Sequence, residues 1–399
     1  MKTRPTQSPP PRGIALMLVM VIIFALTVII AAFAYSMKVE MRLAQVTDYN
    51  VQLEWMGRSG VELARYALSM KCAGQEGVDS LNQFWAGGTS PCSNDLPPIS
   101  LKDFPLGNGK ISVTITDMER KWDINVVADP KGPKLDVLQK AVMLAGATDP
   151  SASSTIVDSI LDWVNPNTDS HFNGAETEYY SRLDPPYNCK NGPIDDLSEL
   201  LLIKGVTPDI YWGANSTNHP VSPYQLAGPT GFDHTPRKTK SRFSNEADKE
   251  TNVVGLADLF SPMGAKLNIN TASAATLQLL PGIDENTAAR IIQMRAGPDG
   301  IDGTDDDAPF HSVGELNSGL PGGGGPGGLV GVAPPAGVPG APAAGLQVAG
   351  LAAYCDVRSY VFEVHVAAEI NGVKRNFTGI VSRSGPNASQ VTCVRFYWE

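Results

Sequence analysis

The chain has 399 residues, which is more than a single globular unit usually contains. It carries 41 Asp and Glu against 31 Lys and Arg, for a formal net charge of −10. Such an acidic chain argues against nucleic-acid binding, because phosphate contacts need clustered Lys and Arg.

The N-terminal region predicts a membrane anchor. Residues 13–36 contain no charged side chain, and about 20 apolar residues are enough to cross a hydrocarbon core of ~30 Å. Lys2, Arg4 and Arg12 precede this run without any acidic residue, so the positive-inside rule places residues 1–13 in the cytoplasm and the rest outside. A cleaved secretory signal is the alternative, but the run exceeds the roughly 7–15 apolar residues typical of one.

The helical pattern continues beyond the membrane segment. Apolar or small residues recur at helical spacing, with polar residues between them, at Val39, Leu43, Val46, Leu53, Gly60, Ala64 and Ala67. We therefore predict one helix over residues 14–70, roughly 85 Å long. Its apolar stripe would allow lateral packing on copies or relatives of the same helix.

The short basic leader, Gly13 at its end and the long apolar helix after it resemble a type IV pilin or a type II secretion pseudopilin. The resemblance implies that prepilin peptidase cleaves between Gly13 and Ile14 and that the new N-terminus, Ile14, is methylated. Most members of the family carry Glu at the fifth mature position, where it pairs with the N-terminal amine of a neighbouring subunit. Here that position is Leu18. In this family the missing Glu marks the K subunit of type II secretion, the largest minor pseudopilin.

Strand signals follow in residues 71–130 and helical signals in residues 131–318. Residues Lys110–Asp117 alternate strictly, which predicts a strand with Ile111, Val113 and Ile115 facing inward, and Lys121–Val127 is predicted as its hairpin partner. Candidate helices span 134–145, 153–164, 197–204, 274–280 and 286–296. Gly, Pro and Ala dominate residues 319–347, which predicts a linker.

Strand signals return in residues 348–399. The predicted strands are Ser359–Ile370, Val373–Ser384 and Gln390–Trp398, and Asn371 with Gly372 is a strong two-residue hairpin signal. The predicted fold class is therefore α+β. A pilin-like long N-terminal helix would pack on an antiparallel β-sheet, with an all-α domain inserted between strands, and the resemblance implies the same architecture.

The cysteines predict no metal centre, because none forms a Cys-x-x-Cys pair. Outside the membrane disulfides can form. Cys72–Cys92 and Cys355–Cys393 are the candidate pairs, which would leave Cys189 over. The alternative is that the thiols stay free.

Two segments around Gly205 and Gly282 share one pattern, in which an apolar helix ends at a Gly and a second helix follows. They resemble helix-hairpin-helix elements, whose backbone amides hold a phosphate in DNA-binding proteins. The acidic pair Asp284 and Glu285 argues against that role here. We interpret both glycines as tight turns between helices that need positive φ.

The segment Asp299–Asp307 contains five carboxylates and two glycines within nine residues. These charges would repel one another in a compact loop, and Ca²⁺ accepts about six to eight oxygen ligands. With no His or Cys in the run, we predict calcium rather than zinc. The expected ligands are Asp299, Asp302, Asp305 and Asp307, with Asp306 pointing elsewhere. A solvated acidic loop is the alternative.

Residues 165–176 form a second, weaker calcium candidate. Oxygen-bearing side chains fall at EF-hand spacing at Asn165, Asn167, Asp169, Asn173 and Glu176. The flanking residues resemble a stretch of the K subunit, whose helical domain binds calcium, and Asp162, Glu178 or Asp184 could contribute instead. The alternative is a polar turn stabilised by Asn and Asp caps.

The chain contains no Gly-x-Ser-x-Gly, P-loop or His-Glu-x-x-His motif, so we expect no enzyme activity. The predicted function is that of a minor pseudopilin of type II secretion, with a single pass through the inner membrane and its C-terminal part in the periplasm. It would lie at the pseudopilus tip, initiate assembly and act in protein export, with the I and J minor pseudopilins and the major pseudopilin as partners. The alternatives are a type IV pilus minor pilin and a membrane-anchored helix-hairpin-helix protein of DNA uptake.

Overall fold

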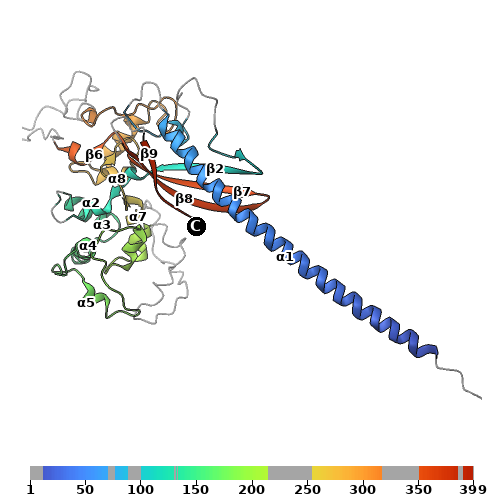
Figure 1. Ribbon diagram of the computed structural model, residues 1–399. Coiled ribbons are helices and arrows are strands. Elements are labelled where there is room, and N and C mark those ends of the chain that lie inside the picture. Colours follow the sequence, from blue (N-terminus) through green and yellow to red (C-terminus); the bar gives the residue numbers. More distant parts are fainter. Residues whose placement is uncertain are drawn as a thin grey trace, which may run out of the picture.

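The computed structural model describes residues 12–70, 77–88, 100–129, 132, 134–213, 254–316, 350–384 and 390–398. The long helix α1 (Arg12–Ser69) leaves the globular part as a free stem, and its C-terminal end lies against an antiparallel sheet (Figure 1). A group of shorter helices lies on the other side of the molecule from the stem. The arrangement is the predicted α+β fold with a pilin-like helix.

Helix α1 is uninterrupted over 58 residues, so it is roughly 87 Å long. Its bounds agree with the predicted helix within two residues. Side chains from Leu16 to Val46 are exposed on every side. The C-terminal part is instead buried against the sheet through Leu53, Met56, Val61, Ala64, Ala67 and Leu68.

Two glycines bring α1 close to the sheet. A Cβ added at Gly60 would lie 2.4 Å from Cγ1 of Val366, and one added at Gly57 would lie 2.6 Å from the ring of Phe377. Both positions are therefore occupied by the one residue that leaves room for the strand side chains. The stem is seated through backbone contact as well as through apolar side chains.

The sheet has five antiparallel strands in the order β1-β2-β7-β8-β9. Their bounds are β1 (Phe104–Leu106), β2 (Gly109–Asp117), β7 (Val361–Ile370), β8 (Val373–Ser384) and β9 (Gln390–Trp398). Ile111, Val113 and Ile115 are buried as predicted. Asn371 and Gly372 take φ of 49° and 83°, as a type I′ hairpin turn requires.

The prediction that Lys121–Val127 pairs with the preceding strand is wrong. Strand β3 (Trp122–Asp123) instead pairs in parallel with β4 (Phe260–Ser261). The Asp123 carboxylate then accepts a hydrogen bond from the amide of Asn125 at 2.8 Å and caps the short helix α2 (Ile124–Val127). A cap of this kind starts a helix where β-branched residues favour a strand.

The helical domain has its own hydrophobic core, separate from the core between α1 and the sheet. Its helices are α3 (Leu135–Leu144), α4 (Pro150–Val164), α5 (Thr177–Tyr180), α6 (Pro208–Trp212), α7 (Leu256–Leu259), α8 (Ala274–Gln278) and α9 (Glu285–Arg295). Short 3₁₀ helices span Phe84–Ala86, Met118–Arg120, Leu197–Leu202 and Leu351–Ala353. Strand β5 (Leu267–Asn268) pairs in parallel with β6 (Cys355–Asp356), so the chain segment just before β7 belongs to this domain. The predicted linker at 319–347 lies outside the described residues.

Candidate assembly stem, acidic loops and domain junction

The free part of α1 is the candidate assembly surface. By length and composition, the helix over Leu16–Ser69 could cross a membrane, since its most apolar stretch has a mean hydropathy of 3.1 and is 0% buried within the chain. Leu18 lies on this stretch with 58% of its surface exposed. A leucine there offers no group that could pair with an amine. Gly13 and Ile14 lie in the first turn of α1, and their processing and methylation stay predictions.

The acidic loop does not bring its predicted ligands together. Both carboxylate oxygens of Asp302 accept hydrogen bonds from Arg295, from Nε at 3.0 Å and from Nη2 at 2.7 Å. Arg295 is buried and also donates to the carbonyls of Ile269 and Ala272 at 2.8 Å. The charge of Asp302, one of the predicted ligands, is therefore already balanced by a guanidinium.

The remaining carboxylates of this loop mostly hold its turns. Asp299 accepts from the amide of Ile301 at 2.7 Å, and Asp307 accepts from the amide of Gly303 at 2.8 Å. The Thr304 hydroxyl donates to Asp306 at 2.7 Å and lowers the pKa of that carboxyl, while Asp305 is exposed. Within the described ranges, no group of three or more His, Cys, Asp or Glu side chains is arranged to hold a metal. The predicted four-ligand set does not fit this geometry.

The exposed part of the second loop is a capped turn. Asn165 and Asn167 accept hydrogen bonds from the amides two residues further on, at 3.4 Å and 3.1 Å. Asp169, Glu178 and Asp184 are exposed. The alternative of a turn stabilised by Asn caps therefore describes this stretch.

The base of the same loop contains a buried polar site. The Asp162 side chain is fully buried and accepts hydrogen bonds from His171, from the backbone amide at 3.1 Å and from Nδ1 at 2.5 Å. Glu176 caps α5, and burial raises its pKa, with the negative charge of Asp162 adding to the effect. Glu176 Oε1 and Asn191 Oδ1 are both buried, and neither accepts a hydrogen bond from a described residue. Buried oxygens that lack donors beside a carboxylate suit a hard cation, and no local sequence signal marks Asn191.

Both hairpin glycines have the predicted positive φ, 88° at Gly205 and 75° at Gly282. Gly282 joins α8 to α9, and the Asp284 carboxylate accepts a hydrogen bond from the amide of Thr287 at 2.8 Å. A carboxylate therefore already caps the helix N-terminus that would bind a phosphate in the DNA-binding version of this element.

The predicted Cys355–Cys393 disulfide is wrong. Cys355 is a buried free thiol that donates to the carbonyl of Leu351 at 3.2 Å, and Cys393 is an exposed free thiol. The reason is that β6 pairs with β5 in the helical domain, whereas Cys393 lies on the edge strand β9. Cys189 is also free and buried, while Cys72–Cys92 lies outside the described residues.

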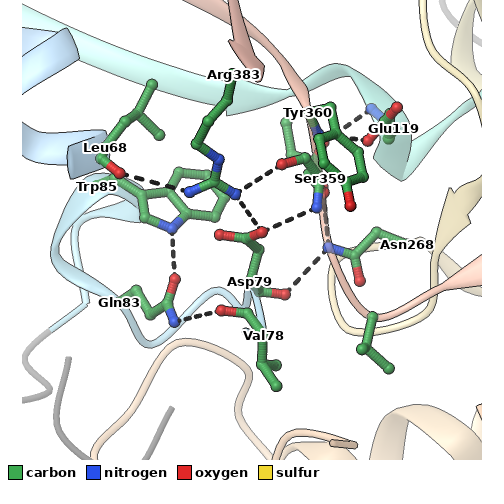
Figure 2. Close-up of polar contacts among 12 residues, drawn as sticks. Leu68, Val78, Asp79, Gln83, Trp85, Glu119, Asn268, Ser359, Tyr360 and Arg383 are labelled. Atoms are coloured by element: carbon green, nitrogen blue, oxygen red, sulfur yellow. Dashed lines mark hydrogen bonds and ion pairs between the residues drawn. The ribbon is translucent and has the colours of Figure 1, made fainter. Parts of the chain in front are cut away.

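A buried polar cluster joins the helical domain to the sheet (Figure 2). We name it the junction cluster; it comprises Asp79, Asp117, Glu119, Asn268, Thr271, Ser359 and Arg383. The Asp117 carboxylate accepts from the hydroxyls of Thr271 and Ser359, both at 2.5 Å. Arg383 forms an ion pair with Asp79 and donates to the carbonyl of Ser359 at 2.6 Å.

Asn268 links the two parts of the chain most directly. Its side-chain amide donates to the carbonyl of Asp79 at 3.1 Å and to the hydroxyl of Ser359 at 2.7 Å. The sequence analysis missed this cluster, because its members come from segments far apart in the chain and follow no local pattern.

A long N-terminal helix whose C-terminal part packs on an antiparallel sheet defines a pilin-like protein. The fold is similar to a chain in the crystal structure of the GspK-GspI-GspJ complex from the enterotoxigenic Escherichia coli type 2 secretion system. The TM-score is 0.55 at 17% identity, and the match covers 89% of this chain and 99% of that one.

Sequence comparison narrows the class. The family model for type II secretion system (T2SS) protein K matches residues 123–214, and a helix-hairpin-helix motif matches residues 263–301. The type II secretion system protein K of Klebsiella pneumoniae is 26% identical over 208 residues, which are 50% of this chain and 60% of that protein. The protein of the same name from Pseudomonas aeruginosa is 23% identical over 306 residues, 74% of this chain and 75% of that one. These matches support the resemblance to type II secretion system protein K that the leader and stem indicated.

Proposed function

We propose that the chain is a minor pseudopilin at the tip of the type II secretion pseudopilus, where it initiates assembly and acts in protein export across the outer membrane. The sheet and the helical domain together form the globular part of the chain, which we call the head. The observation that carries the proposal is helix α1, whose C-terminal part is buried against the sheet of the head and whose remaining length exposes apolar side chains. An exposed apolar helix of this length needs either lipid or other helices around it. Lipid would surround the helix while the subunit lies in the membrane, and the helices of other subunits would surround it after assembly.

Two features support a place at the tip. Leu18 has no carboxylate to offer the N-terminal amine of an adjacent subunit. The head also holds a second core, that of the helical domain, beside the sheet. A subunit with no partner beyond it has no need of the missing pairing group, and it has space for the additional domain.

The proposed partners are the I and J minor pseudopilins, then the major pseudopilin. The name of the similar complex, GspK-GspI-GspJ, supports the first two. Prepilin peptidase would cleave between Gly13 and Ile14 in the inner membrane, and the head would lie in the periplasm. No catalytic step is part of this function.

The test is co-expression of the full chain with the I and J subunits, followed by purification in detergent. We expect a complex of the three.

A second experiment locates the subunit in sheared pseudopili. The variant Leu18→Glu should appear along the pseudopili as well as at their ends, whereas the control Leu18→Met should stay at the ends. Failure of the unaltered chain to bind I and J would refute the proposal, and tip-only incorporation of Leu18→Glu would show that Leu18 does not set the position.

We also propose that Ca²⁺ binds at the base of the second loop, held by oxygens of Asp162, Glu176 and Asn191. The two buried oxygens without donors support this location over the acidic loop, where Arg295 neutralises Asp302. A bound calcium ion would neutralise two buried carboxylates and tie α4 to α5. The calcium ion would have a structural role only.

Thermal melting of the full chain with and without calcium tests this second proposal. At calcium about 100-fold above its dissociation constant, binding to the folded state adds about 2.7 kcal/mol of stability. The variant Glu176→Gln should lose that gain, and Asp299→Asn in the acidic loop should keep it. A loss in Asp299→Asn with retention in Glu176→Gln would reverse the assignment.

A further inference from the structure

The junction cluster contains more acidic groups than cations. Asp79, Asp117 and Glu119 are exposed by only 3%, 2% and 1%. Among the described residues, Arg383 is the cation that forms an ion pair within the cluster, and its partner is Asp79. Asp117 and Glu119 therefore have no ion-pair partner in the described part of the chain, and burying both in the ionised form would be costly.

The two carboxyl groups differ in their hydrogen bonds. Burial raises the pKa of Asp117 to about 6. Its ionised form is still favoured over that of Glu119, because it accepts two hydroxyl hydrogen bonds at 2.5 Å and the amide of Glu119 at 2.8 Å. Glu119 accepts from the amide of Tyr360 at 2.6 Å through Oε2. The backbone amide of Ala265 also favours the ionised form of Glu119. Its other oxygen, Oε1, is buried and accepts no hydrogen bond of ordinary geometry from the described residues.

The surroundings of Glu119 add negative charge. Asp117 on the same segment and Asp79 on the facing segment both repel its ionised form. The nearby lysines point elsewhere, since Lys121 donates to the carbonyl of Ala257 at 2.8 Å and Lys266 to that of Ala352 at 2.6 Å. Asp123, the remaining neighbour, is also acidic, and a Cβ added at Gly264 would lie 3.7 Å from its Cβ and 3.3 Å from Cγ of Glu119.

We propose that the junction cluster holds one proton, carried mainly by Glu119, and that this proton keeps the helical domain attached to the sheet. With the proton in place, the Asp79–Arg383 pair and the contacts of Asn268 and Ser359 form around a neutral Glu119. Without it, three neighbouring carboxylates share one guanidinium, and repulsion loosens the strand segment at Tyr360 and the turn that carries Asn268 (Figure 2).

The direction of the pH effect follows from the pKa of Glu119, which burial raises from 4.5 to about 8. Because the folded state holds the proton more tightly than the unfolded state, the stabilisation is complete below the unfolded pKa and is lost as pH rises towards the folded one. Between these values each pH unit lowers the ratio of folded to unfolded chain by up to about tenfold.

The test compares the full chain with Glu119→Gln in detergent by urea unfolding from pH 5 to pH 8. Gln keeps the shape of the protonated side chain and cannot ionise. We expect similar stability at pH 5 and an advantage of Glu119→Gln at pH 8 of more than about tenfold in the unfolding equilibrium. The exposed control Glu285→Gln should show no such trend. A difference between the chain and Glu119→Gln that does not change with pH would overturn the proposal.

Two further measurements cover the remaining cases. If Glu119→Gln does not fold, the infrared spectrum of the unaltered chain provides the test. It should show a protonated carboxyl band at pH 7 that disappears above pH 9, and absence of that band at pH 7 would overturn the proposal. Hydrogen exchange at the amides of Ser359 and Tyr360, compared between the two chains at pH 9, tests the attachment itself. Equal protection in both would refute the loosening of the junction.

Discussion

Replacing Gly60 with Ala tests how closely the stem is seated on the sheet. The new Cβ would lie 2.4 Å from Cγ1, 2.8 Å from Cγ2 and 3.2 Å from Cβ of Val366. Val366 is fully buried on β7, between β2 and β8. Its β-branched side chain is stiff at χ1 and is closely packed, so it cannot easily move aside. The helix must therefore lift away from the strand to regain an ordinary contact.

The expected loss of stability is about 2 kcal/mol. Overpacking a core costs about 1–3 kcal/mol, and the upper end applies because three atoms of one rigid side chain block the new methyl group. Against this, Ala is about 1 kcal/mol better than Gly inside a helix. Val366→Ala alone should cost about 2 kcal/mol for the space it leaves. The double variant should lose clearly less than the sum, because the two changes fill and empty the same space.

Urea unfolding of the full chain in detergent, followed by tryptophan fluorescence, measures all three variants. Trp85 packs edge-on against Phe362 in the same core, with ring centroids 5.1 Å apart, and so reports on this interface. A Gly60→Ala variant as stable as the unaltered chain, or losses in the double variant that simply add, would refute the reasoning.

Three further changes test the junction and the loops. Arg383→Met should lower the free energy of unfolding in urea by about 3–5 kcal/mol, because it leaves buried Asp79 without its partner. The exposed control Arg58→Met breaks an ion pair on the stem and should cost under about 1 kcal/mol. Equal losses in the two variants would contradict the role given to Arg383. Arg295→Gln should lower stability by about 1–3 kcal/mol, because Asp302 and two buried carbonyls lose their donors; no change in melting temperature would mean that this pair is not formed. Gly282→Ala should lower stability by about 1 kcal/mol, since φ there is 75°. Gly282→Asn should lower stability less, and the reverse order would argue against a left-handed turn at this position.

Periodic features of the sequence predicted their structures well. The alternation in 110–117 and 359–370 gave β2 and β7 with the correct buried faces, and the turn at Asn371 and Gly372 has the backbone that hairpins need. The long helix was predictable because its apolar spacing persists into the segment buried by the sheet. In each case the determining interaction lies within a few residues along the chain.

Features that depend on distant partners were not predictable. Asp302 was predicted as a calcium ligand, but it pairs with Arg295, which lies seven residues earlier and also donates to the carbonyl of Ile269. Asp123 ended a strand pattern by capping a helix. The pairing of β6 with β5 moved Cys355 away from the strand that carries Cys393. Composition alone also overstated the need for a cation in the acidic loop, because its amides and hydroxyl already satisfy most of the carboxylates.

The order of the strands has a consequence for the timing of folding. β2 ends at Asp117 and its neighbour β7 begins at Val361, so residues 118–360 must be made before the two can pair. At about 5–20 residues per second, that delay is roughly 12–50 s. The stem is synthesised well before β7, the strand that receives Gly60. The stem can be held at a defined angle to the sheet only after β7 has been made, so a chain truncated before β7 would carry the apolar helix without a rigid base.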